Sequence, residues 1–371
     1  MNHVTMLDYI AATPAAMEEN VRRSRELTRP LTEEYVGNGY KNVWIVACGS
    51  SANAAWCARP FVRRRLRCEV KIVTPFTFAV SEHDFGPEDM VLVVSQSGYS
   101  LNALSAAAVI RERGRRCLAL TADLQSDLAK TADLAVDYGG GRETVGYVTR
   151  GMTTLALFFM LFALETARAL GFDAPEETER LRSQLLQAAE AHRQVERTWP
   201  KFLRKHYDAL AAMNVTWWCG VGANLGTAME GALKLSETMN IPASAFETEE
   251  FIHGPNLQLT PDYTLFFLDG GAGSRRIGQI FDAACIVTEK AFLLTTDPER
   301  RGERVFRVPA DVPEEITPLC FLPIVQLTAY RFAEDLGRWK KHPLQRKMEQ
   351  ALSSKSDNYS ASSLNADTPE R

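Results

Sequence analysis

The amino-acid sequence predicts an α/β protein built from two tandem, doubly wound parallel sheets with flanking helices. Short, almost wholly apolar runs alternate with helix-forming stretches, which is typical of strands buried on both faces of a parallel sheet. The same order of elements returns after Trp199 and Pro200, which indicates that one unit is duplicated. The 371 residues, 46% of them apolar, are enough for two domains of ordinary size.

The first copy begins with the apolar strand Asn42–Cys48, which runs into Gly49-Ser50-Ser51 and then a helix. A later strand, Met90–Val94, ends in the sequence SQSGYS, Ser95 to Ser100, and a helix from Leu101 to Arg113 follows. Further strands are expected at Val70–Val73 and Cys117–Thr121, and a leading helix is expected from Met6 to Arg29, ended by Pro30.

The second copy repeats these elements. The segment VTWWCGVGANLGTAM corresponds to VWIVACGSSANAAW, and YTLFFLDGGAGS corresponds to MVLVVSQSGYS. A polar helix from Pro175 to about Glu196 joins the copies. The sequence therefore predicts an N-terminal helical segment (1–34), a first domain (35–174), a linking helix (175–200), a second domain (201–336), a C-terminal segment (337–352) and a disordered, Ser/Asn/Asp-rich tail (353–371).

Composition excludes several classes of protein. A net charge of -4 and a pI near 6.0 give no field that would attract nucleic acid or an anionic membrane. Seven cysteines stand singly, which predicts reduced thiols in the cytoplasm and neither a disulfide framework nor a zinc site. The N-terminus lacks a signal peptide, and Met152–Leu164 is too short for a membrane span, so we expect a buried helix there.

The segment Ser95–Ser100 has the chemistry of an anion site. Hydroxyls and a glycine stand where a strand ends and a helix begins, so backbone N–H groups and the positive end of the helix converge there. Ser50 and Ser51 follow another parallel strand and should open at the same edge. No P-loop or dinucleotide motif is present, so a monophosphate is expected. The alternative is an ordinary N-cap at Ser100.

The equivalent turn of the second copy, Asp269–Ser274, begins with a carboxylate where the first has a hydroxyl. A carboxylate repels a bound anion, because the two carry charges of the same sign. We therefore expect the copies to divide the work, one holding phosphate and the other supplying titrating groups.

Candidate acids and bases lie in the second copy. Glu230, Lys234 and Glu237 project from one side of a helix, at i, i+4 and i+7. The alternative is a solvated helix face with an ordinary Glu–Lys pair. His253, within EEFIHGP, is the best-placed histidine, and the preceding glutamates would support a cationic imidazole. A packed or solvated histidine is the alternative there.

Four stretches carry a resemblance to a known family: CGSSANAA, SQSGYSLNAL, TRGMTT from Thr149, and AMEGALKLSE followed by HGP. The paired units resemble sugar isomerase (SIS) domains, which are flavodoxin-like. The tandem arrangement, roughly Tyr40 to Leu336, resembles the isomerase half of glucosamine-6-phosphate synthase and the related deglycases of fructosamine 6-phosphates.

The resemblance implies a role for each candidate residue. It implies that Glu237 moves a proton between C1 and C2, and that His253 helps to open the sugar ring, reaching the site from the neighbouring subunit of a homodimer. No cofactor or metal is implied. The sugar phosphate would be held by Ser50, Ser51, Ser95, Gln96, Ser97 and Ser100, and the pocket would be lined or ordered by Glu143, Gly146, Glu230 and Lys234.

Departures from the synthase shape the expected function. The chain starts almost at the isomerase part, its end (ADTPER) has no Schiff-base lysine, and Arg150 replaces a lysine. We therefore expect a cytoplasmic deglycase that cleaves a ketosamine 6-phosphate to glucose 6-phosphate and an amine or amino acid. The alternatives are an amino-sugar 6-phosphate isomerase or deaminase, and a non-catalytic phosphosugar-binding regulator.

Overall fold

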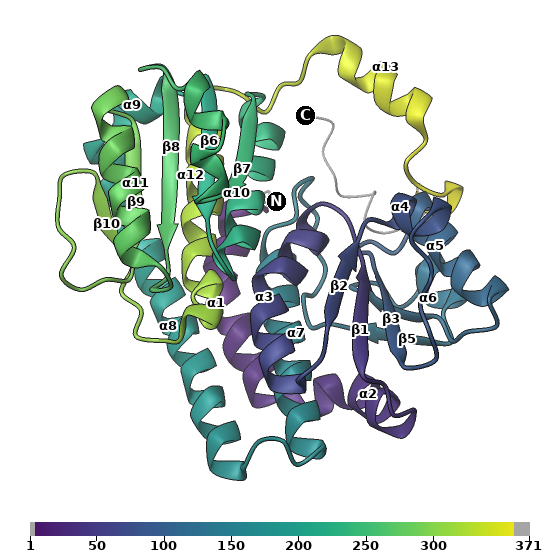
Figure 1. The fold of residues 1–371 in the computed structure, drawn as a ribbon. Coiled ribbons are helices and arrows are strands. Elements are labelled where there is room, and N and C mark those ends of the chain that lie inside the picture. The colour runs from purple at the N-terminus through teal and green to yellow at the C-terminus, as the bar shows by residue number, and fades with distance from the viewer. Residues whose placement is uncertain (1–3, 360–371) are drawn as a thin grey trace. The chain divides into compact units, whose positions relative to one another are not determined.

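The computed structural model describes residues 4–359, which form two compact units (Figure 1). The first unit contains residues 4–5, 15–182 and 341–359, and the second contains 6–14 and 183–340. The boundary therefore falls inside one long helix, α8 (Pro175–Lys205), and not at its ends. The rest of the expected tail, residues 360–371, lies outside the described residues.

The first unit is built on a parallel sheet in the order β2-β1-β3-β4-β5. Its strands are apolar because helices cover both faces, and the predicted strands are confirmed to within two residues at each end. β5 was not predicted, since it is short and only half buried. The strands are β1 (Asn42–Val46), β2 (Val70–Val73), β3 (Asp89–Val94), β4 (Leu118–Thr121) and β5 (Leu134–Asp137).

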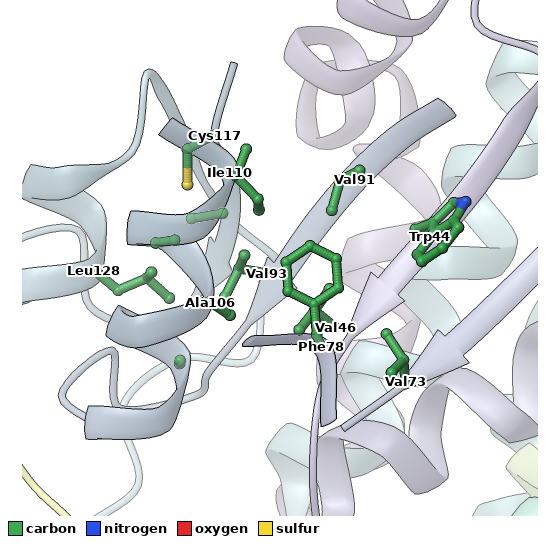
Figure 2. Packing of buried hydrophobic residues seen from close by; sticks show 13 residues of the cluster. Trp44, Val46, Val73, Phe78, Val91, Val93, Ala106, Ile110, Cys117 and Leu128 are labelled. Atoms are coloured by element: carbon green, nitrogen blue, oxygen red, sulfur yellow. The ribbon is translucent and has the colours of Figure 1, made fainter. Parts of the chain in front are cut away.

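One face of this sheet packs on three helices. Alternate strand residues such as Trp44 and Val46 point toward Phe78 and Ile110 in a buried apolar cluster (Figure 2). The residues between them, such as Ile45, are equally buried, because α3 and other helices cover that side. The helices of this unit are α2 (Ser24–Gly37), α3 (Ser50–Leu66), α4 (Pro75–Val80), α5 (Leu101–Glu112), α6 (Asp127–Thr131), α7 (Arg150–Ala169) and α13 (Pro343–Leu352).

The second unit repeats this topology. Its parallel sheet has the order β10-β9-β8-β6-β7, which becomes the order of the first sheet when equivalent strands are matched. Helix α1 (Met6–Arg22) is divided, and only its residues 6–14 belong to this unit. The other elements are α9 (Tyr207–Ala211), β6 (Val215–Gly220), α10 (Asn224–Met239), β7 (Ala243–Glu247), β8 (Tyr263–Asp269), α11 (Ser274–Val287), β9 (Ala291–Thr295), β10 (Val305–Arg307) and α12 (Pro318–Asp335).

Three local expectations were wrong. The leading helix does not end before Pro30: it breaks at Arg23, and Pro30 lies inside α2, where the buried side chains Leu31 and Tyr35 hold the helix on the core. The linking helix continues past Glu196 to Lys205. Residues 353–359 are not disordered, because they bond to the first unit, as described below.

The apolar helix α7 is longer than expected. Within the described part of the chain, α7 and the stretch Glu314–Asp335 are long and apolar enough to cross a membrane. In each, 89% of the most apolar window is buried inside the protein, and α7 packs against α2 and α3. Both therefore have the packing of core helices.

Candidate functional site

The stretch Ser95–Ser100, called here the hydroxyl turn, joins β3 to α5. The Gly98 N–H donates to the Ser95 hydroxyl at 3.2 Å, and the Ser95 and Ser100 hydroxyls are 3.4 Å apart. Gly98 has φ +72°, and a Cβ there would lie 2.0 Å from the Ser126 hydroxyl, so only glycine fits. Ser100 is the N-cap residue of α5, as the alternative expected, but its side chain makes no capping bond to the helix.

Ser50 and Ser51 open at the same edge of the sheet, as expected. β1 and β3 are parallel neighbours, with Val46 opposite Val93, so both strands end together. The Asn102 amide, in the first turn of α5, contacts the Cys48 sulfur at 3.6 Å. The two serine-bearing turns of the first unit are therefore adjacent.

Gln96, within the hydroxyl turn, contacts Glu143. The Gln96 amide donates to the Glu143 carboxylate at 2.7 Å, which also accepts the backbone N–H groups of Thr149 and Arg150 at 3.2 and 2.6 Å. Burial raises the pKa of Glu143 against the effect of these bonds. Glu143 therefore holds the start of α7 and orients Gln96, while Gly146, on the same loop, is exposed.

A residue that the sequence analysis missed also reaches the hydroxyl turn. The Lys355 ammonium donates to the hydroxyls of Ser97 and Ser100 at 2.9 and 3.0 Å. Backbone pairing of the C-terminal strap, Ser354–Tyr359, with the turn brings it there (Figure 1). No periodic pattern marks the strap, so the sequence offered no signal except a lysine among serines.

In the second unit, α10 carries a buried cluster of three charges. The Lys234 ammonium is 3.3 Å from Glu230 and 2.7 Å from Glu237. Lys234 and Glu230 are fully buried, while the Glu237 side chain is 33% exposed, so the alternative of a solvated face is wrong. Burial alone would lower the pKa of Lys234, but the two carboxylates outweigh it and raise that pKa. Lys234 is therefore an ammonium that fixes a reachable carboxylate.

His253 lies on the surface of the second unit, immediately after a short 3-10 turn. Its backbone N–H donates to the Glu250 carbonyl at 3.1 Å. The nearby Glu249 carboxylate is engaged by the Arg276 guanidinium at 2.8 and 2.7 Å, which lowers the pKa of Glu249. His253 also interacts electrostatically with Glu249, to a smaller extent than Arg276 does, and the expectation that the preceding glutamates support a cationic imidazole stays a prediction.

The turn Asp269–Ser274, called here the acid-filled turn, is occupied by its own side chain. The buried Asp269 carboxylate accepts the Gly271 N–H at 3.1 Å and the hydroxyls of Ser274 and Thr295 at 2.5 and 2.7 Å. The expectation that this turn does not hold an anion fits these contacts. The Asp269 carboxylate is not open to a ligand, because both of its oxygens accept hydrogen bonds within the turn or from Thr295.

The structure thus brings the predicted residues together in two groups. The serines, Gln96 and Glu143 form one group in the first unit, and Glu230, Lys234 and Glu237 form the other in the second. The meeting of these two groups and the approach of His253 remain predictions.

Comparison with known proteins identifies the domain that carries the serines, Gln96 and Glu143. Residues 40–164 match the SIS domain family. This stretch is a SIS domain. The SIS domain contains both serine-bearing turns, Gln96 and Glu143, so the predicted resemblance is confirmed for the first unit.

The similarity extends beyond the SIS domain. Glutamine–fructose-6-phosphate aminotransferase of Pyrobaculum aerophilum is 28% identical over 323 residues, which is 83% of this chain and 51% of the relative. The chain therefore spans about half the length of the curated relatives that it matches.

Solved structures share the fold over nine tenths or more of the chain. A Clostridium difficile 630 protein, provisionally described as a phosphosugar isomerase, superposes with a TM-score of 0.86 at 23% identity, covering 95% of this chain and 99% of that one. The C-terminal domain of glucosamine-fructose-6-phosphate aminotransferase from Francisella tularensis superposes with a TM-score of 0.78 at 18% identity, covering 90% and 96%. The predicted fold class, parallel sheets in an α/β protein, is confirmed.

Proposed function

We propose that the protein acts on a sugar 6-phosphate by moving a proton between C1 and C2, with Glu237 as the base. The observation that carries this proposal is the partly exposed Glu237 carboxylate, held at 2.7 Å by the fully buried Lys234 ammonium. The buried ammonium holds the neighbouring carboxylate in one position, and a general base must be positioned in this way. An ordinary ion pair on a solvated surface would leave the lysine exposed, whereas Lys234 is fully buried.

The reaction that we propose is hydrolysis of a ketosamine 6-phosphate of the fructosamine type. In its open-chain form, C1 carries an acidic C–H beside the C2 carbonyl. Glu237 removes a C1 proton and returns it at C2, which leaves an imine between C1 and the amine nitrogen. Water then cleaves this imine to glucose 6-phosphate and a free amine or amino acid. One positioned proton transfer contributes about 10²–10⁴-fold in rate.

The remaining predicted residues would bind and prepare the substrate. The hydroxyl turn, with Ser50 and Ser51, would hold the phosphate far from the reacting carbons and keep them in register. His253 would help to open the sugar ring, from the partner subunit of a homodimer, and its exposure on the second unit is compatible with that role. The single cysteines and balanced charge favour a cytoplasmic setting.

One observation favours the alternative of an amino-sugar 6-phosphate isomerase or deaminase. The absence of a lysine in the last six residues was one reason for preferring a deglycase, yet Lys355 lies on the hydroxyl turn. That reason no longer separates the two reactions. The curated relative named above is a glutamine–fructose-6-phosphate aminotransferase, a name that also fits this alternative. A phosphosugar-binding regulator would bind without turnover.

The test is a substrate panel combined with a base variant. Purified protein is given fructoselysine 6-phosphate, glucosamine 6-phosphate or fructose 6-phosphate, and glucose 6-phosphate and fructose 6-phosphate are measured separately. We expect glucose 6-phosphate from the first substrate, and Glu237→Gln should lower kcat about 10²–10⁴-fold while phosphosugar binding and folding persist.

The matched control is Glu289→Gln, which removes a carboxylate from an exposed position of the same unit. Its turnover should equal that of the unmodified protein. His253→Ala should also remove most of the turnover. Near-normal kcat in Glu237→Gln would refute the assignment of the base, and turnover of glucosamine 6-phosphate alone would select the alternative reaction.

A further inference from the structure

The hydroxyl turn offers an anion many donors but no charge of its own. Its six residues, SQSGYS, contain hydroxyls, an amide and backbone N–H groups, and α5 begins directly after them. A phosphate monoester carries about -1.5 to -2 charges at neutral pH. Hydrogen bonds between ionised partners are roughly twice as strong as neutral ones. Tight binding of a phosphate therefore calls for a cation close to these hydroxyls.

The C-terminal strap brings one cation to the turn and is itself firmly attached. The Leu101 N–H donates to the Ser354 carbonyl at 3.1 Å, and the Ser356 N–H donates to the Tyr99 carbonyl at 2.9 Å. Two side chains of the strap then bind one carboxylate: Ser356 and Asn358 donate to Asp127 at 2.6 and 2.9 Å. This pairing fixes Lys355 between two backbone bonds, directly opposite Ser100.

The contacts of Lys355 leave it suited to an anion. Its ammonium donates to Ser97 and Ser100 and lies 5.4 Å from the centre of the Tyr359 ring, and in the described part of the chain no carboxylate forms an ion pair with it. Because each hydroxyl accepts from Lys355, its own proton stays available to donate. The cluster therefore presents O–H and N–H donors together with one positive charge.

Partial burial adds to this argument. Removal from water lowers the pKa of Lys355, an effect that the Cys48 thiol only partly offsets. A charged group that is desolvated without an opposite charge is unfavourable, and a bound anion removes that cost. Neither the two serine hydroxyls nor the Tyr359 ring supplies a negative charge.

We propose that Lys355 is a ligand of the substrate phosphate, delivered by the C-terminal strap to the hydroxyl turn. This inference rests on the proposed function, because it assumes that the turn holds a phosphosugar. It assigns the lysine to the phosphate end of the substrate, since Ser97 and Ser100 belong to the turn and not to the C1–C2 end. Lys355 is a positioning residue in this role and forms no covalent bond.

The experiment compares phosphate binding in Lys355→Gln, Lys355→Arg and the unmodified protein, by calorimetry with inorganic phosphate and glucose 6-phosphate. Removing a charged hydrogen-bond partner should weaken both ligands about 10- to 100-fold in Lys355→Gln. Lys355→Arg should recover most of the affinity, because it keeps the charge. With a turned-over substrate, KM should rise by a similar factor while kcat changes little.

The control is Lys347→Gln, which removes the same charge from an exposed position of α13 and should leave binding unchanged. Unchanged or tighter binding in Lys355→Gln would overturn the inference, and tighter binding would show that the strap blocks the turn. Loss of kcat without loss of affinity, with sugar attached to Lys355 after borohydride reduction, would also overturn it. If the unmodified protein binds no phosphosugar at all, the proposed function itself fails.

Discussion

The hydroxyl turn and the acid-filled turn share a frame of hydrogen bonds made by the residues that follow the neighbouring strand, and they differ at their first residue, Ser95 or Asp269. Thr121 and Thr295 occupy equivalent positions, and each accepts a backbone N–H, from Asp123 at 3.2 Å and from Asp297 at 2.9 Å. Asp123 and Asp297 in turn accept the next N–H groups at 2.8 Å in both units. The frame alone therefore does not create an anion site.

What differs is whether the donors of the turn are already satisfied. Asp269 takes the place of Ser95 and accepts the N–H and hydroxyl groups that an anion would need. The start of the preceding helix differs in the same sense. Val46 and Cys219 lie opposite the equivalent residues Val93 and Phe267, so Ala223 stands where Ser50 does, and the Glu314 carboxylate accepts the Ala223 N–H at 3.1 Å. In the second unit, carboxylates of the protein itself accept the N–H groups at both turns. In the first unit, the equivalent positions carry serine hydroxyls.

The largest expected effect comes from making the two turns alike. Ser95→Asp should place a carboxylate in the hydroxyl turn, in a frame that accommodates one in the other unit. Repulsion between like charges about 4 Å apart near a protein surface is about 4 kcal/mol, so phosphosugar affinity should fall about 1000-fold. Calorimetry with glucose 6-phosphate measures this change.

Ser95→Ala is the matched control, because it removes the hydroxyl without adding charge. It should cost only about tenfold in affinity, the contribution of one hydrogen bond to a charged group. Equal affinities in Ser95→Asp and Ser95→Ala would show that the phosphate binds elsewhere.

A smaller effect is expected from emptying the acid-filled turn. Asp269→Ala leaves the Gly271 N–H and the buried Thr295 hydroxyl without their acceptor, and the Ser274 hydroxyl keeps only the Gly271 carbonyl. The free energy of unfolding should fall by about 3 kcal/mol, measured as a shift in the urea midpoint. The variant should gain no affinity for glucose 6-phosphate, because no strap lysine reaches that turn in the described structure. Strong phosphate binding by Asp269→Ala would break the comparison.

The smallest effect concerns the anchor of the C-terminal strap, which exists only on the hydroxyl turn. Asp127→Ala removes the acceptor of Ser356 and Asn358, so Lys355 should be held less firmly and phosphosugar affinity should fall a few-fold. Hydrogen exchange of the Ser356 amide should become faster. Asp84→Ala, at an exposed position of the same unit, is the control and should change neither quantity.

The pH dependence of this anchor has a definite sign. The bond from the Ser356 hydroxyl, helped by Asn358, holds the pKa of Asp127 below its usual range. A carboxylate with a lowered pKa in the folded state stabilises that state above the unfolded pKa, and the contribution is lost as the pH falls through the folded value. The protection of the Ser356 amide from hydrogen exchange should therefore be constant from neutral pH down to about 4 and decline only below it. A decline between pH 7 and 5 would contradict the role of Asp127.

By itself, the sequence determined the strands, the two serine-bearing turns and the duplication. Apolar runs such as NVWIVAC and glycine–serine turns act within a few residues, so their pattern is visible in the chain. The i, i+4, i+7 spacing likewise put Glu230, Lys234 and Glu237 on one face. It did not show that this face is buried, since burial depends on what packs against it.

Only the tertiary structure decided which charges meet the turns. Lys355 and Ser97 are far apart in the chain, and their contact depends on backbone pairing that leaves no composition or period behind. Asp269 and Glu143 look like available acids in the sequence, but the oxygens of both carboxylates accept hydrogen bonds from nearby N–H and hydroxyl groups. A hydrogen bond between distant segments is set by how the elements pack, and for that reason it could not be read from local pattern.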